Sequence, residues 1–223
     1  MMIFLSDMKV KFKLFGETGG LKPASFPRLL LKSLLFIIFI ICISSCGSNY
    51  IPKPRGYYRI DFPEKNYQRF ESGFPYSFEY PVYARIVPDS SKMAEPYWIN
   101  IVFPDFKAQL HLSYKPVKNN LATYLNDAHT LVNKHIQKAN AISQQEFANP
   151  AQKVYGLVYE ISGSDAASVY QFYATDSTRN FVRGALYFDL VPNNDSLRPV
   201  IDFLKKDIEH LINTFEWKNT KKL

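Results

Sequence analysis

The spacing of the apolar residues changes along the chain, and the order of these periods constrains the fold more than any other feature. Apolar and polar residues alternate in segments between 77 and 114, which is typical of strands with one buried face. From 119 to 139 the apolar residues follow helical spacing instead. Three further strand segments and a second helical pattern follow, at 153–161, 168–175, 180–190 and from about 192. This order predicts an α+β fold, a mainly antiparallel sheet with two amphipathic helices packed on one face.

The amino-terminal part of the chain has the features of an export signal. An apolar run extends from Leu34 to Ile43 and follows several basic residues. The run is short for a membrane span, which needs about 20 apolar residues, so a cleaved secretory signal is favoured. The predicted organisation is a signal peptide (1–45), a proline-rich tether (46–70), a single globular domain (71–217) and a basic tail (218–223).

The end of the signal carries a more specific pattern. Ile43-Ser44-Ser45-Cys46 resembles the bacterial lipobox, in which an aliphatic residue and two small residues precede a cysteine. The resemblance implies cleavage before Cys46 and acylation of this cysteine, with palmitate among its acyl chains. A plain signal peptide with an incidental cysteine and an uncleaved anchor remain the alternatives. Two or more acyl chains are enough for stable anchoring to a membrane.

The formal charge of +7 invites a nucleic-acid interpretation, but much of it belongs to the signal. Residues 1–45 hold six of the 27 basic residues and two of the 20 acidic ones, so the rest carries 21 against 18, a net charge of +3. No dense basic face remains, and nucleic acid is excluded as an expected partner. The 18 Phe and 15 Tyr are the more unusual feature. We expect them on the second face of the sheet, either covered by the tether or exposed to a partner.

No catalytic, metal or cofactor site is predicted. His129 and His135 are six residues apart on the predicted helix, whereas a helical zinc pair is four apart. The glycines are isolated, so the chain has no glycine-rich phosphate loop. We therefore expect a protein that is not an enzyme and that needs no cofactor.

One candidate polar cluster comprises Asp176, Ser177 and Arg183. Ser177 could be a hydrolase nucleophile, but Asp, Ser and Thr between two strands are more typical of a hairpin turn. Arg183 alternates with apolar residues, and on an inward face it would need a carboxylate partner, for which Asp176 or Glu160 are the candidates. Alternatively, a buried arginine could line a small anion pocket.

Five long, aromatic-rich stretches resemble one family, that of the gliding-motility lipoprotein GldD. They are YIPKPRGYYRIDFPEKNY (50–67), WINIVFPDFKAQLHLSYKPV (98–117), KVYGLVYEISG (153–163), QFYATDSTRNFVRGALYF (171–188) and PNNDSLRPVIDFLKKDIEHLINTFEW (192–217). The resemblance covers nearly the whole segment after Cys46, and Cys46 is the one functional position that it carries over.

The resemblance implies a lipid-anchored accessory protein of the cell envelope that is required for gliding motility. It would be linked to the gliding or type IX secretion machinery and would act through protein contacts. Surface-exported lipoproteins of bacteria with this machinery tend to have acidic residues just after the cysteine, and Gly47 to Asn49 contain none. The resemblance therefore implies a place at the outer membrane, facing the periplasm, and not export to the cell surface. The alternative is a periplasmic lipoprotein that binds or modifies an envelope polymer or ligand.

Overall fold

Seven antiparallel strands form the larger sheet of the structure, in the order β3-β4-β5-β9-β8-β7-β6. The structure is a computed structural model, and it describes residues 32–33, 36, 56, 59–71 and 73–218. Strands β5 and β9 join two meanders through nine residue pairs. The strands are β3 (Arg85–Pro88), β4 (Ile99–Phe103), β5 (Ala108–Pro116), β6 (Ala141–Asn149), β7 (Val154–Ser162), β8 (Ser168–Thr175) and β9 (Asn180–Phe188).

The expected strand segment at 77–87 is divided between two sheets. Its first part is β2 (Tyr76–Pro81), and its second part is β3 in the larger sheet. The segment expected at 97–103 begins two residues later, as β4, because Tyr97 has a left-handed backbone with φ 68° and cannot continue a strand. A short 3₁₀ turn, η1 (Pro104–Phe106), then leads into β5.

Two α-helices connect the strands, as the spacing predicted. Helix α2 (Leu121–Asn133) links β5 to β6 and is shorter than the expected range 119–139, since a 3₁₀ turn, η2 (Ile136–Lys138), follows it. Helix α3 (Asn194–Asn213) begins where capping residues were expected. The side chain of Asn193 accepts a hydrogen bond from the backbone N–H of Ser196, which satisfies one of the free N–H groups of the first turn.

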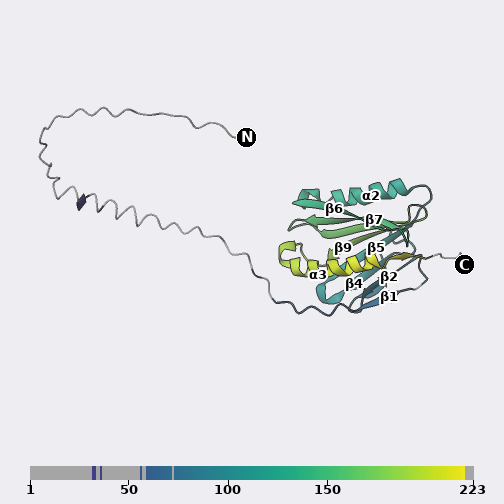
Figure 1. Cartoon of the computed structure of the whole chain (residues 1–223), viewed down its shortest axis with the longest axis horizontal. Coiled ribbons are helices and arrows are strands. Elements are labelled where there is room, and N and C mark those ends of the chain that lie inside the picture. Colours follow the sequence, from purple (N-terminus) through teal and green to yellow (C-terminus); the bar gives the residue numbers. More distant parts are fainter. Residues whose placement is uncertain (1–31, 34–35, 37–55, 57–58, 72, 219–223) are drawn as a thin grey trace, which may run out of the picture. The chain divides into compact units, whose positions relative to one another are not determined.

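The two helices lie on opposite faces of the larger sheet, which corrects the prediction that both pack on one face. Phe172 packs in one core with Leu204 of α3, whereas its neighbour Tyr173 packs with Ala128 of α2. Successive side chains of a strand point to opposite faces of the sheet, so the helices cover different faces (Figure 1). Strand β8 is buried along nearly its whole length and therefore needs cover on both sides. The predicted α+β class and the antiparallel sheet are confirmed.

A second, three-stranded sheet lies on the same side as α3. It has the order β1-β2-β10, where β1 is Tyr67–Phe70 and β10 is Glu216–Trp217. Strand β1 lies within the expected tether at 46–70, so regular structure begins before the expected domain boundary. Tyr76, Phe78 and Phe215 of this layer are at most 1% exposed and stack on one another between the two sheets.

Many of the aromatic residues therefore pack in the core between the two sheets and α3, and others, such as Tyr159 and Phe181, pack on the α2 side. Of the two expected arrangements, this core corresponds to a covered face and not to an exposed partner face. Burial of one large aromatic side chain contributes about 1.5–3 kcal/mol, so this layer is a main source of stability. Within the described ranges, no helix is long and apolar enough to cross a membrane.

Candidate functional site

The predicted site residues are not brought together into one cluster. Cys46 lies outside the described residues. Asp176 and Ser177 lie in the turn between β8 and β9, and Arg183 lies further along β9. Ser177 has a left-handed backbone with φ 65°, and its N–H donates to the hydroxyl of Thr175 at 3.0 Å. These contacts confirm a hairpin turn at this position.

Asp176 organises this turn. Its Oδ1 accepts hydrogen bonds from the N–H groups of Thr178, Arg179 and Asn180 at 2.7–3.0 Å, and its Oδ2 accepts from the Asn180 side chain at 2.7 Å. Burial alone would raise the pKa of Asp176, but these bonds favour the ionised carboxylate and hold the pKa below its usual value. The carboxylate is occupied by the turn and does not contact Arg183.

The expected carboxylate partners of Arg183 have other contacts. Glu160 pairs with Lys205 of α3, at 2.6 Å between Oε2 and Nζ. The guanidinium of Arg183 instead donates from Nη2 to the side-chain oxygen of Gln171 at 2.5 Å. Among the described residues, no carboxylate lies within 4.0 Å of the Arg183 nitrogens. The prediction of an ion-paired Arg183 is therefore wrong.

A polar cluster surrounds Arg183 on the α2 side of the larger sheet. The strand register places His111, Ala185 and Gln171 side by side in one row across β5, β9 and β8. Arg183 and Tyr187 lie two residues to either side of Ala185 on the same strand, and although burial lowers the pKa of Arg183, Tyr187 acts to raise it. We call Arg183, Gln171, Tyr187, His111 and His135 the Arg183 cluster.

The electrostatics of the cluster are set by one desolvated cation. Burial lowers the pKa of Arg183, and contact with Tyr187 partly offsets this, but a guanidinium stays charged in proteins. Burial also lowers the pKa of His111, with Arg183 adding to the effect and Asp89 opposing it. Burial and Arg183 together lower the pKa of His135, which follows the last turn of α2. Both imidazoles are therefore neutral at pH 7.

Three buried polar atoms on this face have no hydrogen-bond partner among the described residues: Gln171 Nε2, Ser168 Oγ and Asn100 Oδ1. Gln171 is 1% exposed, Ser168 0% and Asn100 7%. Asn100 pairs with His111, and Ser168 pairs with Tyr187, so both border the cluster. Buried polar groups without partners are uncommon and costly, which marks this face as the candidate functional site.

An apolar groove lies beside the first turns of α2. It has a volume of about 400 Å³ and is lined by Leu121 and Leu125 of α2, by Tyr155 and Tyr173, and by Ser177 of the hairpin turn. Ser177 therefore borders a groove, but no histidine lines it with Ser177. No group of three or more potential metal ligands occurs among the described residues.

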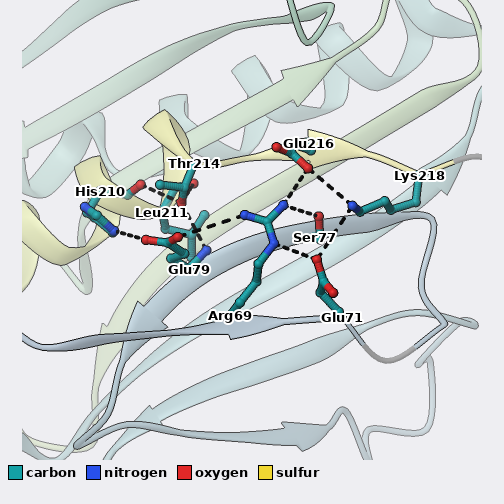
Figure 2. Close-up of polar contacts among 9 residues, drawn as sticks. All are labelled: Arg69, Glu71, Ser77, Glu79, His210, Leu211, Thr214, Glu216 and Lys218. Carbon is teal, nitrogen blue, oxygen red and sulfur yellow. Dashed lines mark hydrogen bonds and ion pairs between the residues drawn. The ribbon is translucent and has the colours of Figure 1, made fainter.

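A charged network joins the three-stranded sheet to α3 (Figure 2). Arg69 of β1 contacts Glu71 at 2.7 Å and Glu216 of β10 at 2.5 Å. Glu79 of β2 contacts His210 of α3 at 2.7 Å. These side chains are about one-third exposed or more, so each pair contributes little and the network serves to align the layers.

Sequence reasoning singled out Arg183 but missed its neighbours Gln171, Tyr187 and His135. A usable signal was present, because Gln109, His111 and Ser113 occupy the polar face of a strand. Their proximity to Arg183 depends on the pairing of β5 with β9, which lie about 70 residues apart in the chain.

The predicted export signal and lipobox, followed by an α+β fold, are the arrangement expected of a lipoprotein. The chain belongs to the family of the gliding motility lipoprotein GldD, whose model matches residues 47–217. Membership of this family implies a lipid-anchored location in the cell envelope. No curated protein matches the chain.

Among solved structures, the chain is similar to the solution structure of cyanobacterial PsbP (CyanoP) from Synechocystis sp. PCC 6803. The two share 13% sequence identity, the match covers 72% of this chain and 98% of that one, and the TM-score is 0.45.

Proposed function

We propose that this protein is a lipid-anchored, non-enzymatic accessory protein of the gliding or type IX secretion machinery, acting through protein contacts. The observation that carries the proposal is the family match, which begins at residue 47, directly after the lipobox cysteine Cys46. We further propose that Cys46 carries the lipid and that the domain faces the periplasm from the outer membrane.

The contacts of the segment after the proposed anchor support a domain held close to a membrane. Phe62 stacks on Phe203 of α3 with 4.3 Å between ring centroids, and Lys65 pairs with Asp207 of the same helix at 2.7 Å. Only 12 residues lie between Cys46 and Arg59, and such a chain spans about 45 Å at most. A domain tethered in this way would meet partners at or near the bilayer surface.

Several exposed apolar side chains are suitable for protein contacts. Met93 is 83% exposed, Val191 88% and Val82 52%. Exposed apolar residues are common singly, so these positions are sites to probe rather than a defined interface.

The experiment is site-specific photo-crosslinking in cells, with the probe residue placed at Met93 or Val191. We expect crosslinks to envelope proteins of the motility or secretion machinery. A probe at Gln144, an exposed polar position on the edge strand β6, is the control. Normal spreading of a deletion strain, together with no crosslink from either apolar position, would refute the proposal.

The anchor is tested separately by labelled palmitate. Incorporation into the wild-type protein and its loss in Cys46→Ala would support lipidation at this residue. Equal labelling of the two proteins would place the lipid elsewhere, and no labelling of either would leave a plain signal peptide or an uncleaved anchor.

A second candidate function, binding of an envelope polymer or ligand, is favoured by the Arg183 cluster. For this function Arg183 would contact the ligand, whereas Asp176 and Ser177 would only form the turn between β8 and β9.

A further inference from the structure

We propose that the Arg183 cluster is a binding site for a small carboxylate anion, with the Arg183 guanidinium as its main recognition group. The inference goes beyond the accessory role and does not depend on it. It rests on an uncompensated cation, on neighbouring hydrogen-bonding groups without partners, and on their placement on a sheet face that α2 leaves partly open.

The guanidinium of Arg183 lacks a partner of opposite charge within the described part of the chain. A guanidinium removed from water is normally paired with a carboxylate, because desolvation of a lone charge is costly. Arg183 is partly buried, and among the described residues its guanidinium has a hydrogen bond to the Gln171 oxygen but no carboxylate within 4.0 Å. This contact leaves part of its fork of five N–H donors free for a planar, bidentate acceptor.

Two side chains near Arg183 have buried polar atoms without hydrogen-bond partners among the described residues. The Oε1 of Gln171 accepts from Arg183, so its Nε2 lies beside the guanidinium and is a donor without a protein acceptor. Ser168, opposite Tyr187 in the register, adds a hydroxyl that also lacks a partner. A carboxylate has two oxygens with several acceptor positions, and it would supply the missing acceptor for such donors.

The charge balance decides between carboxylate and phosphate. Arg183 is the one cation of the cluster, because His111 and His135 are neutral at pH 7 and Asp89 near His111 is acidic. A monoanion balances a single guanidinium, whereas a phosphate dianion would leave one charge uncompensated in a partly desolvated site. Selectivity for carboxylates therefore follows from the composition of the cluster.

The anion would approach the guanidinium at its exposed edge. Ala185, between Arg183 and Tyr187 on β9, is 0% exposed, so the approach is over the partly exposed Arg183 and His111 and not over Ala185 itself. Helix α2 packs on Phe181 and Tyr173, to one side of the row that contains Ala185. Arg183, His111 and His135 are each partly exposed, so a small solute can approach the guanidinium from this side.

The test is a histidine titration of the mature lipoprotein in detergent micelles, followed by NMR with labelled histidine. The chain has four histidines, two in the cluster (His111 and His135) and two elsewhere (His129 and His210). Binding of acetate at constant ionic strength neutralises the field of Arg183. We therefore expect a saturable rise in the pKa of His111 and His135, by about 0.5 or more, with His129 and His210 unchanged.

Several outcomes would overturn the proposal. They are an equal response of all four histidines, an equal response to neutral acetamide, and no response up to about 0.1 M acetate, since a single ionic contact gives only weak affinity. A stronger response to inorganic phosphate than to acetate would overturn the carboxylate assignment.

Two variants separate recognition from folding. Arg183→Gln should abolish the acetate response, and Arg183→Lys, which keeps the charge but loses the planar fork, should weaken it about tenfold. Arg198→Gln, at an exposed position of α3, is the matched control and should respond like the wild type. An acetate response that survives in Arg183→Gln refutes the site, and if that variant does not fold, Arg183→Lys and the wild-type titration decide.

Discussion

The buried carboxylate of Asp207 provides the sharpest test of how the segment 59–71 is attached to the rest of the domain. Asp207 lies on α3 and is 1% exposed. Its Oδ1 accepts from the Tyr67 hydroxyl at 3.0 Å and pairs with Lys65 Nζ at 2.7 Å, and its Oδ2 accepts from the Tyr83 hydroxyl. One carboxylate therefore holds the segment before β1, β1 itself and the β2–β3 loop to the helix. We predict that Asp207→Ala destabilises the protein strongly.

The expected magnitude follows from these three contacts. Removing one partner of a buried ion pair typically costs about 3–5 kcal/mol, because the other charge stays buried without compensation. Lys65 is 28% exposed and recovers part of its hydration, which favours the lower half of that range. The two phenols lose a charged acceptor, and each such bond contributes about 1.5–3 kcal/mol. The three contacts share one carboxylate, so their contributions overlap and are not added. We expect about 4 kcal/mol for Asp207→Ala and about half of this for Asp207→Asn, which keeps an acceptor oxygen.

Urea unfolding followed by fluorescence measures this loss, since Trp98 and Trp217 both pack against the main core. Asp202→Ala is the matched control, because Asp202 lies on the same helix, 62% exposed and 4.0 Å from Arg198. The control should change the free energy of unfolding by less than about 0.5 kcal/mol. If Asp207→Ala costs no more than Asp202→Ala, the proposed attachment of this segment through Asp207 is wrong.

Four further predictions concern single positions. Burial and Asp207 raise the pKa of Tyr67 to about 12, so the phenol's contribution to the free energy of unfolding is complete below pH 10 and is lost as the pH rises towards 12. The urea midpoint of unfolding should therefore fall between pH 10 and 12, and it should fall less steeply in Tyr67→Phe. Gly184→Ala should cost about 1–3 kcal/mol, because the added Cβ would lie 2.1 Å from the buried ring of Phe172; an unchanged melting temperature would contradict this packing. Asp176→Ala should cost about 1–3 kcal/mol by freeing the turn N–H groups, and a loss of function at full stability would instead indicate a direct role. Ser168→Ala should leave the melting temperature unchanged or raise it slightly, because its hydroxyl is buried without a partner, and a large decrease would reveal a hydrogen bond that the structure does not contain.

The sequence was most informative where a strand or helix buries a regular set of apolar residues. The strand predicted at 168–175 coincides with β8, and the second helix begins at the expected caps. Strand β6 was missed because it is an edge strand, in which six of nine residues are exposed and the alternation of apolar residues is lost. Strand β1 was missed because the prolines around it favoured an extended tether.

The placement of the helices required information that a local pattern does not contain. Both helices have an apolar face, but periodicity does not say which side of a sheet a helix covers. The deciding feature is that β7, β8 and β9 carry apolar side chains on both faces, with Phe172 towards α3 and Tyr173 towards α2. A strand that is buried on both sides needs two covering layers, so opposite faces are the physically consistent arrangement.

The Arg183 cluster shows how the same limit applies to the candidate site. Alternation along β9 identified Arg183 as a charged residue among buried ones, and chemistry then required a partner for it. The pairing of β9 with β8 supplies Gln171, a neutral amide, and not the expected carboxylate. A sheet needed only for packing would be more stable with apolar residues at these positions, since buried polar groups without partners each cost about 1–3 kcal/mol. Local violations of this kind are expected where a site is retained for binding, and the ligand that would compensate this guanidinium is an anion.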